Sequence, residues 1–138
     1  MNLRFKCNDF FCRVYVEDTD FQGIVYYANY LKYLERARSQ FLLENNLSQV
    51  SAKNLGNELY VVKSVELSYF QPAILEDELI IKTEIELTSK ARTRFFQSVL
   101  NSKNDTLICE GIVEVCYVNN ISGKPVAFPN RLLKLFDN

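Results

Sequence analysis

The chain has 138 residues, a length that suits one domain with a hydrophobic core of its own, so we assign residues 1–138 to a single domain. Its 48% apolar and 13% aromatic residues are typical of a globular protein and exclude a disordered chain. Sixteen basic and seventeen acidic residues give a formal net charge of −1. This balance argues against a nucleic-acid partner, because no global positive field would recruit one.

The ends and the apolar runs of the chain indicate its cellular context. No apolar run approaches the roughly 18 residues that a membrane span needs. The N-terminal segment MNLRFKCNDFFCRVY lacks the apolar core and the small-residue cleavage site of a signal peptide. Four cysteines form no CxxC pair, which favours reduced thiols. We therefore expect a cytoplasmic protein with no membrane span.

The chain contains no histidine, and this absence restricts the possible catalytic mechanisms and metal sites more than any other feature of its composition. Ser–His and Cys–His nucleophilic arrangements are excluded, as is a histidine general base. Without histidine and without paired cysteines, the usual zinc ligand sets are missing, so we predict no metal site. If the protein is a hydrolase, a carboxylate must move the proton or attack the substrate itself.

The first half of the chain predicts a strand, an acidic loop and a long helix. Residues 10–17 are rich in β-branched and aromatic side chains, which is typical of a strand. A loop with Asp18 and Asp20 follows and turns at Gly23, and then about twenty residues contain neither Gly nor Pro. Their apolar side chains recur at helical spacing, which predicts an amphipathic helix that ends near residues 45–46. The residues of its apolar face are Tyr27, Tyr30, Leu31, Leu34, Ala37, Phe41 and Leu42.

One charged residue falls inside this apolar face. Arg38 lies among the apolar positions, and Glu35 lies at their edge one turn earlier. A charge that is removed from water needs a partner. We therefore expect a half-buried ion pair between Arg38 and Glu35, or a contact from Arg38 to another carboxylate.

The second half of the chain predicts a meander of strands. Residues 47–57 are polar and form a connection, followed by four segments rich in Val, Ile, Tyr and Phe over residues 59–71, 78–88, 91–100 and 106–118. The short connections between these segments indicate antiparallel neighbours. The order is one strand, one long helix and four strands, which predicts an α+β domain in which one sheet covers the helix. A five-stranded antiparallel sheet wrapped around one long central helix is the hotdog fold.

Three stretches carry a resemblance to a known family. The segment VYVEDTDFQGIVYYANYLKYLERARSQFL resembles the 4-hydroxybenzoyl-CoA thioesterase branch of the hotdog superfamily, and within it the YbgC-like acyl-CoA thioesterases. The segments VELSYFQPAILEDEL and SKARTRFFQSVL follow in the same order, so the resemblance covers most of residues 10–118. It implies an enzyme that hydrolyses acyl-CoA or aryl-CoA thioesters to free acid and CoA without a further cofactor. It also implies a homodimer, paired again into a homotetramer, with active sites at the subunit interfaces.

The resemblance also implies roles for residues of the acidic loop. The family's catalytic carboxylate is the second Asp of a D-x-D-x-x-G pattern, which here is Asp20, whereas Asp18 is expected to be a loop or capping residue. Asp20 would either attack the thioester carbonyl or deprotonate water.

Many YbgC-like members have a histidine where this chain has a tyrosine at position 27. Unpaired amides at a helix N-terminus are suited to hold an oxyanion. The predicted oxyanion and substrate-orienting residues are Gly23, Tyr26, Tyr27 and Ala28.

A basic group in the second half is the predicted binding site for CoA. Lys90, Arg92 and Arg94 lie at alternate positions, so on a strand they share one face. Clustered Lys and Arg side chains suit the recognition of CoA phosphates, and a solvated hairpin end is the alternative interpretation. For the whole chain, the alternative to an enzyme is a catalytically silent hotdog module that binds acyl-CoA or acyl-carrier-protein thioesters.

Overall fold

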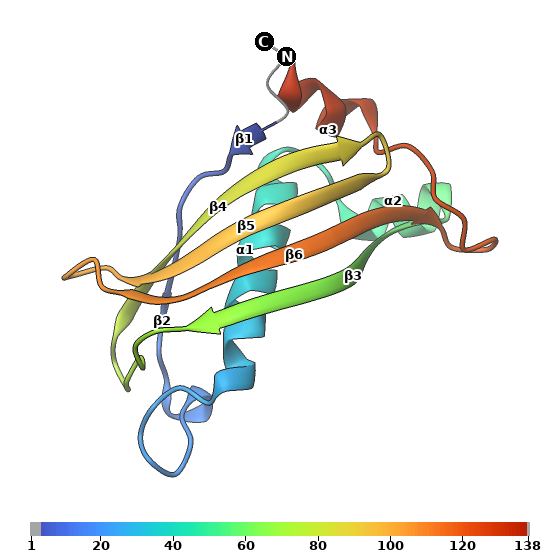
Figure 1. The fold of residues 1–138 in the computed structure, drawn as a ribbon. Helices are drawn as coiled ribbons and strands as arrows, with labels where there is room; N and C mark the ends of the chain where they lie inside the picture. Colours follow the sequence, from blue (N-terminus) through green and yellow to red (C-terminus); the bar gives the residue numbers. More distant parts are fainter. Residues whose placement is uncertain (1–3, 138) are drawn as a thin grey trace.

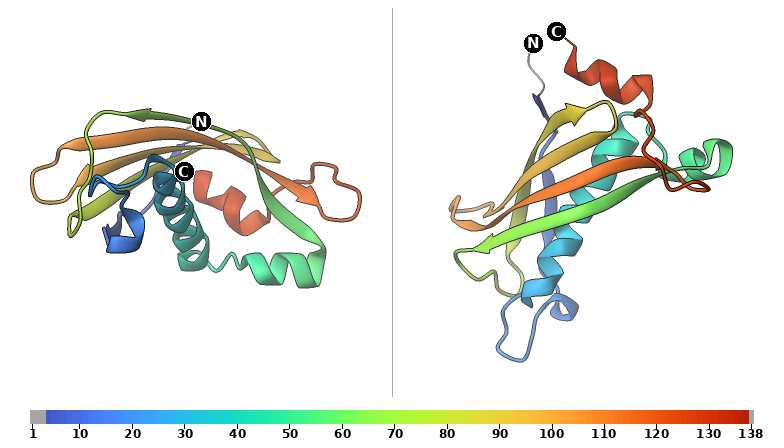
Figure 2. Two further views of the ribbon diagram at one scale, coloured as in Figure 1. Left: turned by 90° about the horizontal axis from the view of Figure 1, so that it is seen from below. Right: turned by 45° about the vertical axis from the view of Figure 1, so that its right-hand side comes forward.

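The computed structural model describes residues 4–137, and its central feature is a curved antiparallel sheet that holds one long helix against its concave face (Figures 1 and 2). The helix is α1 (Tyr30–Glu44). The sheet order is β1-β4-β5-β6-β3, and β2 also pairs with β4. The strands are β1 (Arg4–Lys6), β2 (Phe10–Arg13), β3 (Glu58–Tyr69), β4 (Glu78–Ser89), β5 (Arg92–Asn101) and β6 (Leu107–Asn119). The predicted hotdog architecture is confirmed.

The two short N-terminal strands differ from the single strand that the sequence predicts for residues 10–17. β1 and β2 pair in turn with β4, so together they form one interrupted edge strand. β2 ends at Arg13, and residues Val16–Asp18 form a 3-10 turn instead of extended chain. The Tyr15 amide donates to the Asp18 carboxylate at 2.9 Å, and this bond turns the backbone away from the sheet. Local hydrogen bonding by an aspartate therefore outweighs the strand propensity of the segment.

Helix α1 is preceded by a 3-10 turn (Tyr27–Asn29). It ends at Glu44 with Asn45 as its C-cap, close to the end that the sequence predicts near residues 45–46. Its buried side chains include most of the predicted apolar face, but Tyr27 and Leu31 are exposed. Tyr33, which the helical pattern leaves outside that face, is 1% exposed. The difference arises because the sheet curves around the helix and covers more of its circumference than one flat face would. The buried residues of α1 are Tyr30, Tyr33, Leu34, Ala37, Phe41 and Leu42.

A glycine in the sheet allows the helix to approach it closely. A Cβ atom at Gly111 of β6 would lie 2.5 Å from Leu67 Cδ2, 3.2 Å from the Glu66 carbonyl oxygen and 3.3 Å from Leu34 Cδ1. Leu34 itself is fully buried. The missing side chain therefore leaves the space in which the middle of α1 packs on the sheet.

The predicted ion pair between Arg38 and Glu35, or between Arg38 and another carboxylate, is not formed, so this prediction is wrong. Arg38 donates from one guanidinium nitrogen to Gln97 Oε1 on β5 at 3.0 Å, and it forms no ion pair with a carboxylate of residues 4–137. The Glu35 carboxylate instead accepts a hydrogen bond from Ser39 at 3.0 Å. A buried amide on the sheet is within reach of the arginine because α1 lies across β5, a tertiary contact that helical spacing does not reveal.

Three short helical segments complete the domain. The predicted connection at 47–57 contains α2 (Gln49–Gly56), which begins where Ser48 Oγ accepts a hydrogen bond from the Ser51 amide. The C-terminal segment forms α3 (Asn130–Leu133) and a 3-10 turn (Lys134–Phe136). Leu132 and Phe136 are buried there against the central core. Within residues 4–137, no helix is both long and apolar enough to cross a membrane.

Candidate active site

The acidic loop forms a tight hairpin before the N-terminal end of α1. It lies on the side of the domain away from α3 (Figure 1). The Asp20 amide donates to the Ile24 carbonyl at 2.8 Å, and the Gly23 amide donates to the Asp20 carbonyl at 3.0 Å. Gly23 has φ +83°, a left-handed conformation that glycine adopts without steric cost. Thr19 and Val25 pair below the turn. The loop therefore has a defined backbone that presents Asp20 at its tip.

The Asp20 carboxylate is half-exposed, and one of its two oxygens accepts a hydrogen bond. Asp20 Oδ1 accepts a hydrogen bond from the Gln22 amide at 2.8 Å, while Oδ2 has no partner among residues 4–137. The Tyr26 side chain is near this carboxylate. The pKa of Tyr26 is raised, first by its hydrogen bond with Tyr27 and also by the negative charge of Asp20. The free oxygen of Asp20 is thus available beside a pair of tyrosines.

Asp18 holds the base of the loop. Its carboxylate is buried and accepts the Tyr15 amide at 2.9 Å. Its carbonyl accepts two further hydrogen bonds, from the Tyr26 amide at 3.0 Å and from Asn29 Nδ2 at 2.8 Å. Asn29 therefore ties the loop to the start of the helix. Sequence reasoning missed this residue, although an asparagine directly before a helix is a signal for such a contact.

The beginning of the helix leaves two backbone donors unused. Within residues 4–137, the amides of Tyr27 and Ala28 have no hydrogen-bond acceptor. The Tyr26 amide donates a hydrogen bond to the Asp18 carbonyl. Unpaired N–H groups at the N-terminal end of a helix carry a partial positive charge. The two free amides can therefore bind an oxygen atom that develops negative charge.

A pocket of about 260 Å³ lies beside the loop and is lined largely by aromatic side chains. The rings of Tyr27 and Tyr69 are 6.3 Å apart, and those of Tyr30 and Tyr69 are 5.8 Å apart. Tyr30 accepts the Ala73 amide at 3.2 Å, and burial raises the pKa of Tyr30. Sequence reasoning did not identify Tyr69, which lies 42 residues from Tyr27 yet donates to its carbonyl at 3.3 Å. The pocket offers an apolar volume next to the Asp20 loop.

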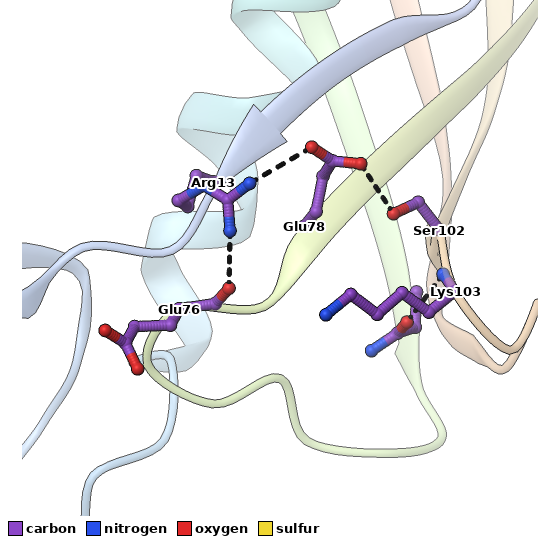
Figure 3. A network of polar contacts seen from close by, with 6 residues as sticks. Arg13, Glu76, Glu78, Ser102 and Lys103 are labelled. Atoms are coloured by element: carbon purple, nitrogen blue, oxygen red, sulfur yellow. Dashed lines mark hydrogen bonds and ion pairs between the residues drawn. The ribbon is translucent and has the colours of Figure 1, made fainter.

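A polar network fixes the strand that leads into the loop (Figure 3). Arg13, the last residue of β2, donates to the Glu76 carbonyl at 2.8 Å and to Glu78 Oε2 at 3.2 Å. Ser102 in the β5–β6 hairpin donates to the other Glu78 oxygen at 3.0 Å. Two turns and the end of an edge strand are therefore held together by this network.

The three basic residues lie away from Asp20 within one chain. Arg92 and Arg94 lie on the outer face of β5, and both contact Glu114, at 3.6 and 3.9 Å. Lys90 is exposed in the β4–β5 turn. This turn and the Asp20 loop are at opposite ends of the domain (Figure 1). One chain therefore does not bring the predicted CoA-binding cluster to the predicted catalytic residue.

The cysteines are not candidates for catalysis. All four are free. Burial raises the pKa of Cys7 and of Cys109 to about 12, and it raises the pKa of Cys12 to about 11. These thiols are protonated at neutral pH and are therefore weak nucleophiles. Residues 4–137 also contain no group of three or more His, Cys, Asp or Glu side chains that could hold a metal ion.

The fold and this site define a class of protein, a hotdog domain with a carboxylate loop before its central helix. The chain belongs to the thioesterase-like superfamily, whose model matches residues 14–136. It is 34% identical to acyl-CoA thioesterase YbgC of Helicobacter pylori, over 91% of this chain and 97% of the relative. It is 38% identical to acyl-CoA thioester hydrolase YbgC of Escherichia coli O157:H7, over 90% of this chain and 91% of the relative. The predicted family and the predicted class of enzyme, a thioester hydrolase, are confirmed.

Solved structures agree with this assignment. A protein from Bartonella henselae named a probable thioesterase has a TM-score of 0.80 and 35% identity, over 88% of this chain and 98% of that one. A 1,4-dihydroxy-2-naphthoyl-CoA thioesterase from Synechocystis has a TM-score of 0.89 at 20% identity, over 96% of this chain and 95% of that one. At that identity the second likeness concerns the fold alone.

The two aspartates of the loop are expected to differ in their effect on stability. Replacing Asp18 with Ala removes the acceptor of the part-buried Tyr15 amide, so unfolding in urea should show a loss of about 1–3 kcal/mol. Asp20→Asn is the matched control, and as a substitution at a half-exposed loop position it should stay within about 0.5 kcal/mol of the wild type. Equal losses in the two variants would contradict the anchoring role of Asp18.

Proposed function

We propose that this protein hydrolyses acyl-CoA thioesters, with Asp20 as the catalytic carboxylate and the Tyr27 and Ala28 amides as the oxyanion site. The names of the YbgC relatives support the substrate class. The observation that carries the proposal is the free Asp20 oxygen in a rigid turn, at the end of a helix with two unpaired amides. Gly23 permits the turn, and the Tyr26 and Tyr27 side chains orient the substrate beside it.

The proposed reaction uses Asp20 and the two unpaired amides together. The thioester carbonyl oxygen accepts hydrogen bonds from the two amides, which stabilise the negative charge that develops on it. Asp20 then acts in one of two ways. As a nucleophile it attacks the carbonyl carbon, CoA leaves as the thiolate, and water hydrolyses the resulting anhydride. As a general base it takes a proton from water, and the hydroxide attacks while CoA leaves. Both routes release a free acid and CoA.

The aromatic pocket beside the loop is suited to receive the acyl group. Tyr27, Tyr30 and Tyr69 provide apolar surface, and their ring edges and faces can pack against an aliphatic chain or an aryl ring. Tyr27 stands where many YbgC-like proteins have a histidine. A carboxylate mechanism does not need that histidine, because Asp20 supplies the base or the nucleophile.

The decisive test is the Asp20→Asn variant. Asparagine keeps the size of the side chain and removes its charge and basicity, so kcat for acyl-CoA hydrolysis should fall at least about 10²-fold. Release of CoA is measured with a thiol-reactive dye over a panel of short, medium and aromatic acyl-CoA substrates. Asp18→Asn is the control and should keep much more activity. A folded Asp20→Asn protein with near-wild-type kcat would contradict the mechanism.

A second candidate function, the silent binding module, makes a different prediction in the same assay. It would bind CoA or carrier-protein thioesters without turning over any of them. The unpaired oxygen of Asp20 favours the enzyme, since a module that only binds has no use for a free carboxylate beside an acyl pocket.

The free edge of β3 supports assembly into a homodimer. β3 has 12 residues and pairs on one side with β6, and residues 4–137 supply no strand for its other side. Val62 and Val65 are 46% and 41% exposed on this strand. Natural proteins usually cover or pair an exposed edge, because its free backbone groups can pair with another chain. We infer that two chains join edge to edge through β3, and that two such dimers form a tetramer.

Light scattering tests this assembly. The wild type should have a mass of two or four chains of 16.1 kDa. Val65→Lys adds a charge at the edge and should lower the mass toward that of one chain. Lys63→Arg on the same strand preserves charge and serves as the control. A wild-type mass of 16.1 kDa at micromolar concentration would exclude the dimer.

The basic cluster is proposed to bind CoA phosphates of a substrate whose thioester lies in another subunit, because its own chain keeps it far from Asp20 (Figure 1). Changing Lys90 and Arg92 together to Ala should raise KM several-fold with little change in kcat, since phosphate contacts are the same in the ground and transition states. The effect should shrink with added salt. Lys53→Ala on α2 is the control, and an unchanged KM at low salt would favour a merely solvated hairpin.

A further inference from the structure

The hydroxyl of Tyr69 contacts the peptide that carries one of the two unpaired amides. Tyr69 is the last residue of β3, and its hydroxyl donates to the Tyr27 carbonyl at 3.3 Å. That carbonyl belongs to the same planar peptide unit as the Ala28 amide. A hydrogen bond on the carbonyl side of this unit therefore restrains the direction in which the Ala28 N–H group points.

The neighbouring peptide is held in the same manner by the backbone. The Tyr27 amide shares its peptide unit with the Tyr26 carbonyl, and that carbonyl accepts the Asn29 amide at 2.8 Å. The first peptide of the site is thus fixed by the turn at the start of the helix, whereas the second is fixed by a side chain from a distant strand. Together the two hydrogen bonds orient both donors of the proposed oxyanion site.

Aromatic packing holds the Tyr69 ring in the position that this hydrogen bond needs. Its centroid lies 6.3 Å from that of Tyr27, edge to face, and 5.8 Å from that of Tyr30. Tyr30 is 3% exposed, and its hydroxyl accepts the Ala73 amide at 3.2 Å. The half-exposed Tyr69 side chain therefore packs against a ring that the core fixes. Burial raises the pKa of Tyr69, so its hydroxyl is protonated at neutral pH and can donate.

A hydrogen bond to a carbonyl oxygen also strengthens the N–H donor of the same peptide. It draws electron density toward the oxygen and leaves the N–H group more positive, which is the cooperative effect seen in chains of hydrogen bonds. Preorganised backbone donors stabilise the negative charge that develops on a carbonyl oxygen during acyl transfer. The Tyr69 hydroxyl is thus placed to affect the transition state through the Ala28 amide.

We propose that Tyr69 is a positioning residue for thioester hydrolysis, whose hydroxyl orients and polarises the Ala28 amide. This inference rests on the proposed function, in which the Tyr27 and Ala28 amides hold the oxyanion. It is distinct from a role in binding the acyl group, because the hydroxyl acts on the backbone whereas the ring lines the pocket.

The kinetics of Tyr69→Phe test this role. Phenylalanine keeps the ring and removes only the hydroxyl, so kcat for acyl-CoA hydrolysis should fall about three- to tenfold, the range that one hydrogen bond supplies. KM should change little, because the developing charge is present only in the transition state. Tyr117→Phe is the matched control. The Tyr117 hydroxyl donates to Glu58 at 2.8 Å near the other end of β3, so its loss should leave kcat unaltered.

NMR spectra of the free protein test the hydrogen bond without any substrate. In Tyr69→Phe, the ¹³C signal of the Tyr27 carbonyl and the ¹⁵N signal of the Ala28 amide should both move upfield, and neither should move in Tyr117→Phe. In the wild type, the Tyr27 carbonyl signal should titrate at alkaline pH together with the Tyr69 ring, because an ionised hydroxyl cannot donate. This titration replaces the variant if Tyr69→Phe does not fold.

The outcomes separate this inference from the proposed function. A wild type that hydrolyses no thioester would overturn both. A wild type that turns over, together with a folded Tyr69→Phe protein of equal kcat, would overturn the inference alone. A rise in KM without a fall in kcat, or Tyr27 and Ala28 signals that do not move, would also contradict it, because the ring would then act by packing alone.

Discussion

The burial of α1 in the concave face of the sheet is the contact on which the rest of the structure depends. Leu34 is fully buried over Gly111, and full burial of a leucine side chain contributes about 1.5–3 kcal/mol. The same contact sets the height of the helix above the sheet. Because α1 cannot rise or turn without opening this core, the groups at its N-terminal end have a fixed position relative to the strands.

The position of the acidic loop depends on that helix, because hydrogen bonds join the two. Asp18 accepts hydrogen bonds from the Tyr26 amide and the Asn29 side chain, both at the start of the helix, and its carboxylate holds the turn after β2. Arg13 and Glu78 join the end of β2, which leads into the loop, to the beginning of β4 (Figure 3). Hydrogen bonds therefore hold the exposed loop at its base, and a reaction with a precisely oriented carbonyl requires such a fixed position.

Two sets of polar groups in this domain differ in how their hydrogen-bonding capacity is used. The Asp18 contacts and the Gln97–Thr83 bond are satisfied within the chain and hold backbone and side chains in place. One oxygen of Asp20 and the amides of Tyr27 and Ala28 have no hydrogen-bond partner among residues 4–137. The unused capacity of the loop and of the helix beginning is the feature on which the proposed thioester site rests.

The amino-acid sequence by itself determined the order of elements, the long helix and the four strands of the meander. Their signals are local, since hydrophobic periodicity and short connections act over a few residues. The acidic loop was also visible in the sequence, and the resemblance of its continuous D-x-D-x-x-G pattern to the family's pattern implied Asp20 as the catalytic carboxylate.

Only the tertiary structure decided which distant residues meet. Arg38 meets Gln97 rather than Glu35, and Tyr69 joins Tyr27 and Tyr30 beside the loop. The tertiary structure also put the beginning of β5, where Arg92 lies, at the opposite end of the domain from the loop that carries Asp20 (Figure 1). Such pairings depend on the register of the strands and on where the helix crosses the sheet. Both are set by the packing of the whole core, and no short stretch of sequence carries that information.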